Sequence, residues 1–334
     1  MAGALQGVRV LDLTNVLAGP FCCHQLAQFG AEVVKVEAPG RGDLARQLGA
    51  DPALNARGMG VSFLAQNAGK ASVTLNLKDP EGKALFLRLV ATADALVENF
   101  RPGVMARLGL GYEVLREVRP ELVYCAISGF GQEGPWRDRP AYDQIVQGVS
   151  GVMAITGDAE SAPLRVGYPI ADTIGGMTAA FAVAAALNAR PRGAFLDVSM
   201  LDAVLATMGW AVSNHLIAGV PPTPNGNENL TSAPSGTFAA GDGPINIAAN
   251  KDEQWLALAR HLGLEALTRD PAYATREARK RNRAALKVAL EAVLTTRPAE
   301  AWERELNALG VPAGAVLSVE AALGTEQVAG RGLL

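Results

Sequence analysis

The sequence predicts an α/β fold, with a Rossmann-like doubly wound parallel sheet in a large domain and a smaller α+β domain after it. Short β-branched runs alternate with helical patterns through the first part of the chain, as in βαβ units. These runs are apolar at successive positions, as in strands buried on both faces. A Pro-, Gly- and Asn-rich stretch at 221–229 then precedes a charged, mainly helical remainder.

These signals define the expected domains and elements. We expect a large domain at 1–205, a linker helix and loop at 206–226, a small domain at 227–312, and a segment at 313–334 that returns towards the large domain. Expected strands of the large domain lie at 8–13, 32–37, 70–77, 95–98, 122–127 and 195–200. Expected helices lie at 19–29, from 79, at 104–108, 112–118, from 172, and at 201–216, with an irregular insert at 44–60. The small domain should contain a hairpin around 240–243, helices at 252–262, 276–294 and 298–309, and an extended segment at 311–317.

Composition excludes several classes of protein. The net charge of −3 gives no reason to expect a nucleic-acid partner, and a hydrophobic content of 49% allows a large core. The three cysteines, Cys22, Cys23 and Cys125, lack CxxC spacing, which favours a reducing cytoplasm over disulfides or a zinc site. A Cys/His nucleophile with His24 is disfavoured because adjacent residues diverge on a helix. No signal peptide or membrane span is expected, and no metal.

The turn after the first predicted strand excludes the commonest use of this fold. It reads TNVLAGP and lacks the GxGxxG of dinucleotide-binding dehydrogenases. Ligands still bind at the carboxyl ends of strands in such sheets. The turns after residues 13, 37, 98 and 127 should therefore line any site.

Two groups of residues near strand ends are candidates for ligand binding. The basic residues Lys35, Lys70, Arg101 and Arg107 could converge on phosphate groups, or they could be solvated surface charges. The segment 99–103 (NFRPG) could hydrogen-bond and stack on a base, or it could be an ordinary turn closed by Pro-Gly.

Polar residues later in the chain, two of them acidic, are candidates for binding or reacting with a substrate. Tyr142 and Asp143, with Gln147, could orient a substrate, or Asp143 could cap the helix that follows it. Asp172 stands at the start of an apolar helix, where it could be an N-cap, a nucleophile, or both.

The surroundings of Asp172 allow a reactive role. Gly175 and Gly176 would let a substrate approach the backbone closely. The helix dipole would keep the Asp172 carboxylate ionised, and the same N–H groups could stabilise an oxyanion.

Motifs along nearly the whole chain resemble the class III CoA-transferases, the family that includes formyl-CoA transferase, carnitine CoA-transferase and α-methylacyl-CoA racemase. The matching segments, in order, are VRVLDLTNVLAGPFCCHQLAQFGAEVVKVEAPGRGD, NAGKASVTLNLKDPEGK, DALVENFRPGVMARLGLGY, YCAISGFGQEGP, AYDQIVQGVSGVMAITG, ADTIGGM, LDVSMLDAVL, INIAANKDEQW, NRAALKVAL and LGVPAGAVLSVEAAL.

The resemblance implies a chemistry and a set of site residues. Asp172 would attack an acyl-CoA thioester to form a mixed anhydride, then an aspartyl-CoA thioester, from which CoA passes to a carboxylic acid. The matching positions for coenzyme A are Val16 through its backbone, and Lys70, Asn99, Phe100, Arg107 and Met200, with Lys70 and Arg107 at the phosphates. The family also forms homodimers of interlocked chains, which the linkers around 214–229 and after 311 would suit.

Some positions depart from the pattern of formyl-CoA transferase. Ala38 and Pro140 replace two cations that contact CoA there, and Arg41, Arg137 or Arg139 are the neighbours that could substitute. Leu17 replaces a polar residue near the acyl group, which argues against formyl or oxalate specificity. Residues 225–235 lack a clear match to that enzyme's Gly-rich loop, and the family pattern implies a further C-terminal segment after Leu334.

Tyr142 separates the two chemistries within the family. The racemase branch has a His at this position, paired with the equivalent of Asp172, and a Glu near Asp252. A phenol is a poor base for an α-proton at neutral pH, and His24, His215 and His261 do not fall at the racemase position. Transfer of CoA is therefore favoured over 2-methylacyl-CoA racemisation. A third alternative is a CoA-binding protein without catalysis, in which Asp172 is only a cap.

Overall fold

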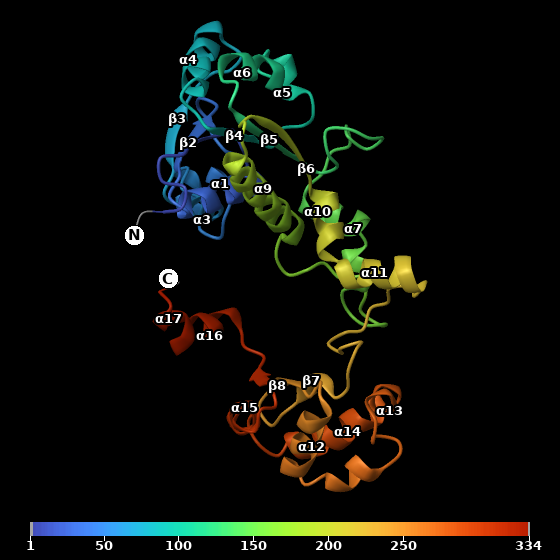
Figure 1. The fold of residues 1–334 in the computed structure, drawn as a ribbon. Helices are drawn as coiled ribbons and strands as arrows, with labels where there is room; N and C mark the ends of the chain where they lie inside the picture. The colour runs from blue at the N-terminus through green and yellow to red at the C-terminus, as the bar shows by residue number, and fades with distance from the viewer. Residues whose placement is uncertain (1–2, 333–334) are drawn as a thin grey trace. The chain divides into compact units, whose positions relative to one another are not determined.

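The computed structural model describes residues 3–332, which form two compact units. Unit 1 contains the chain up to Thr156 and Ala162–Thr223, and unit 2 contains Gly157–Ser161 and the chain from Pro224 onwards (Figure 1). By their contacts, residues 313–332 belong to unit 2, and their predicted return towards the large domain stays a prediction.

Unit 1 is built on a six-stranded parallel sheet with the order β3-β2-β1-β4-β5-β6. The strands are β1 (Arg9–Asp12), β2 (Glu32–Glu37), β3 (Ala71–Thr74), β4 (Ala95–Glu98), β5 (Val123–Ser128) and β6 (Ala194–Ser199). This is the doubly wound order, in which the winding reverses between β1 and β4 and leaves a crevice at their carboxyl ends. The predicted fold of the large domain is confirmed.

Helices cover both faces of this sheet (Figure 1). Val10 and Val97 pack with α1 (Ala18–Gln28), α9 (Ile170–Asn188) and α10 (Met200–Thr207) on one face. Leu11 and Leu96 pack with α4 (Pro80–Val90), α5 (Val104–Arg107) and α6 (Tyr112–Val118) on the other. The alternation of these neighbours along β1 and β4 follows from the two-residue repeat of a strand. The remaining helices of unit 1 are α7 (Asp143–Val149), α8 (Val152–Ile155) and α11 (Gly209–Ala218).

Helix α9 is the long helix beside the sheet. Its length and apolar composition also meet the criterion for a membrane span, which core helices of globular proteins meet as well. Here α9 packs along α1, and Ala179 and Val183 are fully buried between the helix and the sheet.

Three details of the predicted secondary structure are wrong. The insert at 44–60 is not irregular: it contains η1 (Leu44–Gln47) and α2 (Pro52–Ala56), and α3 (Val61–Asn67) follows it. Asp43 and Asp51 cap the first two with their side chains, so Asp at these positions is the local signal for them. The predicted helix 201–216 is interrupted at Met208, next to Gly209. The predicted helix 276–294 is interrupted at Asn282, whose side-chain amide donates to the carbonyl oxygens of Ala272 and Ala278.

Unit 2 is an α+β domain with its own core, as predicted. The antiparallel strands β7 (Ser235–Ala239), β8 (Pro244–Ala248) and β9 (Ala313–Ala315) carry Phe238 and Ile245 into a cluster with Trp255 and Trp302. Its helices are α12 (Asp252–His261), η2 (Glu265–Arg269), α13 (Arg276–Arg281), α14 (Arg283–Leu294), α15 (Ala299–Ala308), α16 (Val319–Leu323) and α17 (Glu326–Gly330).

Candidate active site

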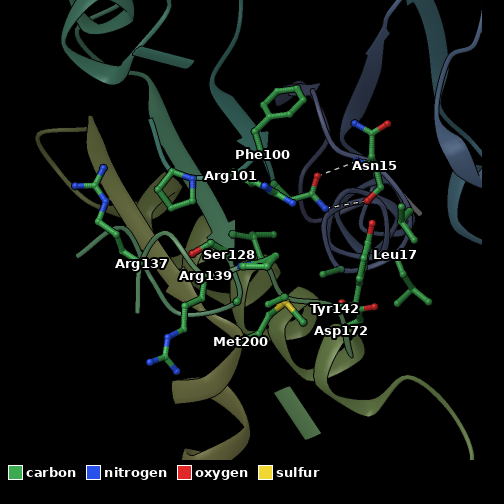
Figure 2. A pocket seen from close by; sticks show the side chains of 18 residues that line it. Asn15, Leu17, Phe100, Arg101, Ser128, Arg137, Arg139, Tyr142, Asp172 and Met200 are labelled. Atoms are coloured by element: carbon green, nitrogen blue, oxygen red, sulfur yellow. Dashed lines mark hydrogen bonds between the residues drawn. The ribbon is translucent and has the colours of Figure 1, made fainter. Parts of the chain in front are cut away.

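The turn after β1 has an unusual backbone. Val16 has a φ of 67°, a conformation that β-branched residues rarely adopt. The side-chain amide of Asn99 holds the turn from both sides: it accepts from the Asn15 N–H and donates to the Asn15 carbonyl, both at 2.8 Å (Figure 2). The Val16 N–H donates to Asp43 Oδ1 at 3.0 Å. Neighbouring groups therefore over-determine the turn, as is usual for strained backbone at functional sites.

A buried ion cluster lies beneath this turn, and it contains two of the predicted phosphate-binding cations. Lys35 Nζ lies 3.0 Å from Asp43 Oδ2 and donates to the Thr14 carbonyl. Lys70 Nζ lies 2.8 Å from Asp12 Oδ2. The two lysine side chains are 1% and 2% exposed.

The contacts of Lys70 argue against the prediction that it meets the phosphates of CoA, and that role stays a prediction. The three donor directions of Lys70 Nζ are taken by Asp12, the Pro20 carbonyl and Asn67 Oδ1. Because Lys35 and Lys70 surround it, the pKa of Asp12 lies below its usual range in spite of burial. Both lysines are therefore engaged within the buried cluster.

The pocket that contains Asp172, called the Asp172 pocket below, opens at the carboxyl ends of β1, β4 and β5, where the fold predicts a site. It encloses about 260 Å³. Six of the predicted site residues line it (Figure 2), namely Val16, Asn99, Phe100, Tyr142, Asp172 and Met200. Residues that had no assigned role also line it, among them Asn15, Ala18, Ile127, Ser128 and Gly129.

Arginines supply the positive charge of this pocket in place of Lys70. Arg101, Arg137 and Arg139 line it and are exposed. Arg107 does not line it, but its Nη1 lies 3.0 Å, and Arg137 Nη2 4.0 Å, from the position that a Cβ would take on Gly103. Arg101, Arg107 and Arg139 form no ion pair within the described residues, so these cations can bind an anion.

The two departures from the family pattern have different neighbours. Pro140 lines the Asp172 pocket, and Arg137 and Arg139 lie there beside it, as the sequence suggested. Ala38 and Arg41 line a larger cavity of about 730 Å³, together with Arg46 and Arg57. Ala38 also lines a third cavity, which shares Asn15 and Phe100 with the Asp172 pocket. Leu17 lines the Asp172 pocket close to Asp172 (Figure 2).

Asp172 lies in the first turn of α9, but it is not the N-cap, which is Pro169. The capping acceptor comes from another helix: Asp143 Oδ1 accepts from the N–H groups of Ala171 at 2.8 Å and Asp172 at 3.4 Å. Capping of its own helix was one of the two alternatives for Asp143, and it does not occur, because α7 begins at Asp143 and Tyr142 is its N-cap, without a side-chain bond. These N–H groups are already engaged and are not available to an oxyanion.

The protonation of Asp172 differs from the prediction that it stays ionised. Burial raises the pKa of Asp172 to about 7, the negative charge of Asp143 adds to this, and Arg165 opposes it in part. The helix dipole was expected to favour the anion, but burial and the neighbouring carboxylate outweigh it. At neutral pH both forms are populated, so the group is a basic carboxylate when ionised.

Gly175 and Gly176 serve packing rather than substrate approach. A Cβ on Gly175 would lie 2.8 Å from Met200 Cγ, and one on Gly176 would collide with the Ala18 carbonyl of α1. Both glycines are buried. They let α1 and α10 approach α9 closely. Ala18 and Met200 therefore lie in the pocket wall beside Asp172.

The remaining candidates lie outside this chemistry. Burial raises the pKa of the thiols of Cys23 and Cys125, and all three cysteines are buried and free. His24 contacts the Ala68 carbonyl and His261 contacts Glu305. Within residues 3–332 no group of three His, Cys, Asp or Glu side chains has the arrangement to hold a metal ion.

Sequence reasoning gave no role to Arg165, which donates to Asp143 Oδ2 at 3.3 Å. Gln147 was expected to help orient a substrate, but its side chain bonds within the protein. It donates to the same oxygen at 2.7 Å and accepts from the Val166 N–H. The i, i+4 spacing of Asp143 and Gln147 on one helix could have indicated their bond. No local pattern indicates Arg165, because it lies in an irregular loop.

A doubly wound sheet with a basic carboxylate at its crevice and arginines at the rim defines an α/β enzyme that acts on an anionic substrate. Comparison with known proteins identifies its kind. The chain belongs to CoA-transferase family III, whose family model matches residues 5–334.

Relatives of known name are similar over nearly the whole chain. The acetyl-CoA:oxalate CoA-transferase of Acetobacter aceti is 42% identical, over 99% of this chain and 85% of that protein. The succinate–glutarate CoA-transferase of Agrobacterium fabrum is 40% identical, over 98% and 84%. Among solved structures, a CaiB/BaiF family protein from Brucella suis is 34% identical and superposes with a TM-score of 0.87, over 99% of this chain and 89% of that one.

Proposed function

We propose that this protein transfers CoA from an acyl-CoA thioester to a carboxylic acid by covalent catalysis on Asp172. The observation that supports the proposal most is the position of this carboxylate, which lies in a pocket that is also lined by Arg101, Arg137 and Arg139. The names of the relatives support the same reaction class.

The reaction balances as four exchanges at carbonyl carbon. The Asp172 carboxylate attacks the thioester carbon, the C–S bond breaks, and CoA leaves as a thiolate. The acyl group and Asp172 are then joined in a mixed anhydride. The thiolate attacks the Asp172 carbonyl carbon and releases the donor acid. The acceptor carboxylate attacks this aspartyl thioester and again displaces the thiolate, which then attacks the acceptor carbonyl and regenerates the carboxylate. No net proton is consumed, and each step is easier than direct exchange.

Burial suits Asp172 to this role. An oxygen nucleophile of pKa about 7 is more basic than an ordinary carboxylate, and it is ionised in the upper part of the physiological pH range. The pocket walls formed by Leu17, Ala18 and Met200 shield an anhydride from water, which would otherwise hydrolyse it.

The anionic part of CoA has a different set of partners from those that the resemblance implied. Arg101, Arg107, Arg137 and Arg139 are the cations that we assign to its phosphates, because guanidinium groups bind phosphate through paired N–H donors. Phe100 and the strained turn at Val16 line the same pocket and can contact the thioester arm.

For the acceptor we propose a small dicarboxylic acid, because oxalate and glutarate name the acceptors of the two relatives. Leu17 argued against oxalate, and this expectation stays a prediction. A panel of acetyl-CoA and succinyl-CoA donors against oxalate, succinate and glutarate tests both statements. Turnover only with monocarboxylic acids would refute the dicarboxylic acceptor.

Trapping tests the mechanism directly. Acyl-CoA supplied without acceptor should leave an adduct on Asp172, which hydroxylamine converts to a hydroxamate that peptide mass analysis can locate. Asp172→Ala should give no adduct and no transfer. A variant at this position with full activity would refute the proposal, and deuterium uptake at the α-carbon of a 2-methylacyl-CoA without transfer would favour racemisation instead.

We also propose that the protein is a homodimer, of interlocked chains, in a reducing cytoplasm. Large apolar side chains on the helices of unit 1 support the dimer, since Phe181 on α9 and Trp210 and Ile217 on α11 are 77%, 76% and 86% exposed in the isolated chain. Sedimentation equilibrium should give twice the chain mass of 34.8 kDa. The free buried cysteines support the compartment.

A further inference from the structure

The Asp143 carboxylate is the most densely bonded group next to Asp172. It is 6% exposed and accepts from four donors. Two are the backbone N–H groups of Ala171 and Asp172, and two are the side chains of Gln147 and Arg165. A buried carboxylate that accepts this many hydrogen bonds is held in one orientation.

This arrangement replaces the local cap that α9 lacks. Pro169, at the N-cap, makes no side-chain bond to the helix, so the orphan N–H groups of the first turn would otherwise be unpaired in a buried place. Asp143 reaches them from α7, and one of them is the N–H of Asp172 itself. The bond therefore ties the backbone of the reacting residue to a second helix.

We propose that Asp143 is a positioning residue for the reaction on Asp172: from α7 it fixes the start of α9 through the N–H groups of Ala171 and Asp172, and it places a second carboxylate beside the reacting one. Gln147 and Arg165 in turn hold Asp143. This inference rests on the function proposed above and states how the reacting carboxylate is positioned.

The charges around Asp172 determine the expected signs. Asp143 faces it from α7 and Arg165 from the loop before α9, while Tyr142 and the arginines Arg101, Arg137 and Arg139 line the open side of the pocket. The neighbours from α1 and α10, Ala18 and Met200, are uncharged. Loss of the negative charge of Asp143 should therefore ease ionisation of Asp172, and loss of Arg165 should hinder it.

Two variants with opposite signs test the proposal. In Asp143→Asn the acid limb of the kcat/KM profile should move down by about one pH unit, and kcat should fall about tenfold, because the amide keeps only part of the bonding. In Arg165→Gln the limb should move up. Arg165 is 47% exposed, so this variant should fold even if Asp143→Asn does not.

The matched control is Asp79→Asn. Like Asp143, Asp79 is a carboxylate of unit 1 that accepts from backbone N–H groups in the first turn of a helix. These are the N–H groups of Glu81 and Gly82 on α4, outside the pocket. Its removal should leave kcat and the pH profile unchanged. A purely structural role for Asp143 would make the two variants lose folding stability alike and would move neither profile.

A second readout does not depend on activity. A carbodiimide with an amine nucleophile labels protonated carboxyl groups, so the labelling of the Asp172 peptide against pH, read by mass spectrometry, reports its ionisation directly. Midpoints that shift down in Asp143→Asn and up in Arg165→Gln would support the proposal. Unchanged midpoints in both variants would overturn it, whereas wild-type protein without transfer activity or adduct would overturn the proposed function alone.

Discussion

Two acidic clusters in unit 1 show how burial is used in opposite ways. Beneath the turn after β1, Asp12 and Asp43 face Lys35 and Lys70, and every charge has an opposite partner. At the start of α9, Asp143 and Asp172 lie together and share one cation, Arg165. The first cluster is neutralised and lowers the pKa of its central acid, Asp12, while the second is under-compensated and raises the pKa of Asp172.

The difference separates support from reactivity. A neutralised buried cluster resists any change of protonation and holds the strained turn at Val16 in place. An acid left without a full partner stays close to its titration point, which is where a nucleophile or base is most effective. A strongly perturbed carboxylate at a strand crevice is for this reason the better mark of chemistry than a cluster of lysines.

The largest expected effect is on the transfer rate and comes from a change at Asp172. Asp172→Asn should lower the transfer rate by about a thousandfold or more, because the nucleophile is lost. Its free energy of unfolding should nonetheless exceed that of the wild type above pH 7. The folded-state pKa of Asp172 is raised, so the wild type loses stability as the pH rises from the unfolded value of 3.8 towards 7. Transfer assays and urea unfolding at pH 8 measure both, and a less stable variant would contradict the second expectation.

The neutralised cluster should respond in the opposite way. Lys70→Ala leaves Asp12 with a single, more distant lysine at 3.8 Å and should cost about 3–5 kcal/mol of folding free energy. Urea unfolding measures it, with Lys78→Ala, an exposed lysine near the same strand, as the control. A loss of CoA affinity without a loss of stability would restore Lys70 to the phosphate site that the resemblance implied.

The pH dependence of the wild type tests the same contrast without a mutation. Because Asp172 must be ionised to attack and its pKa is about 7, kcat/KM should fall about tenfold per pH unit below neutrality and level off above it. An acid limb near pH 4 would show that Arg165 compensates the carboxylate in the free enzyme.

The smallest expected effect concerns the rim of the pocket. Arg101→Gln and Arg139→Gln should each raise KM for acyl-CoA about tenfold with little change in kcat, since phosphate contacts far from the thioester contribute mainly to binding. Arg116→Gln on α6, where Arg116 pairs with Glu113 at the surface, is the matched control. Equal KM values for all three variants would place the CoA phosphates elsewhere.

Much of this fold and part of its site follow from patterns in the sequence. The strands 32–37 and 95–98 and the helix 112–118 occur with the predicted bounds, because β-branched runs and helical spacing are local signals. Six of the proposed site residues share one pocket, and Asp172 lies within it. Family resemblance also indicated the reaction class before any contact was known.

Local sequence determined which residues could do chemistry, namely an acid before a Gly-rich helix and cations at strand ends. Only the tertiary structure decided which of them are free to do it. Lys70 is bonded to Asp12, 58 positions away in the chain, and to two further acceptors. The first turn of α9 is capped by Asp143 from another helix, not by Asp172. Both outcomes depend on charges and hydrogen-bond donors brought together by the winding of the sheet, which no local pattern records.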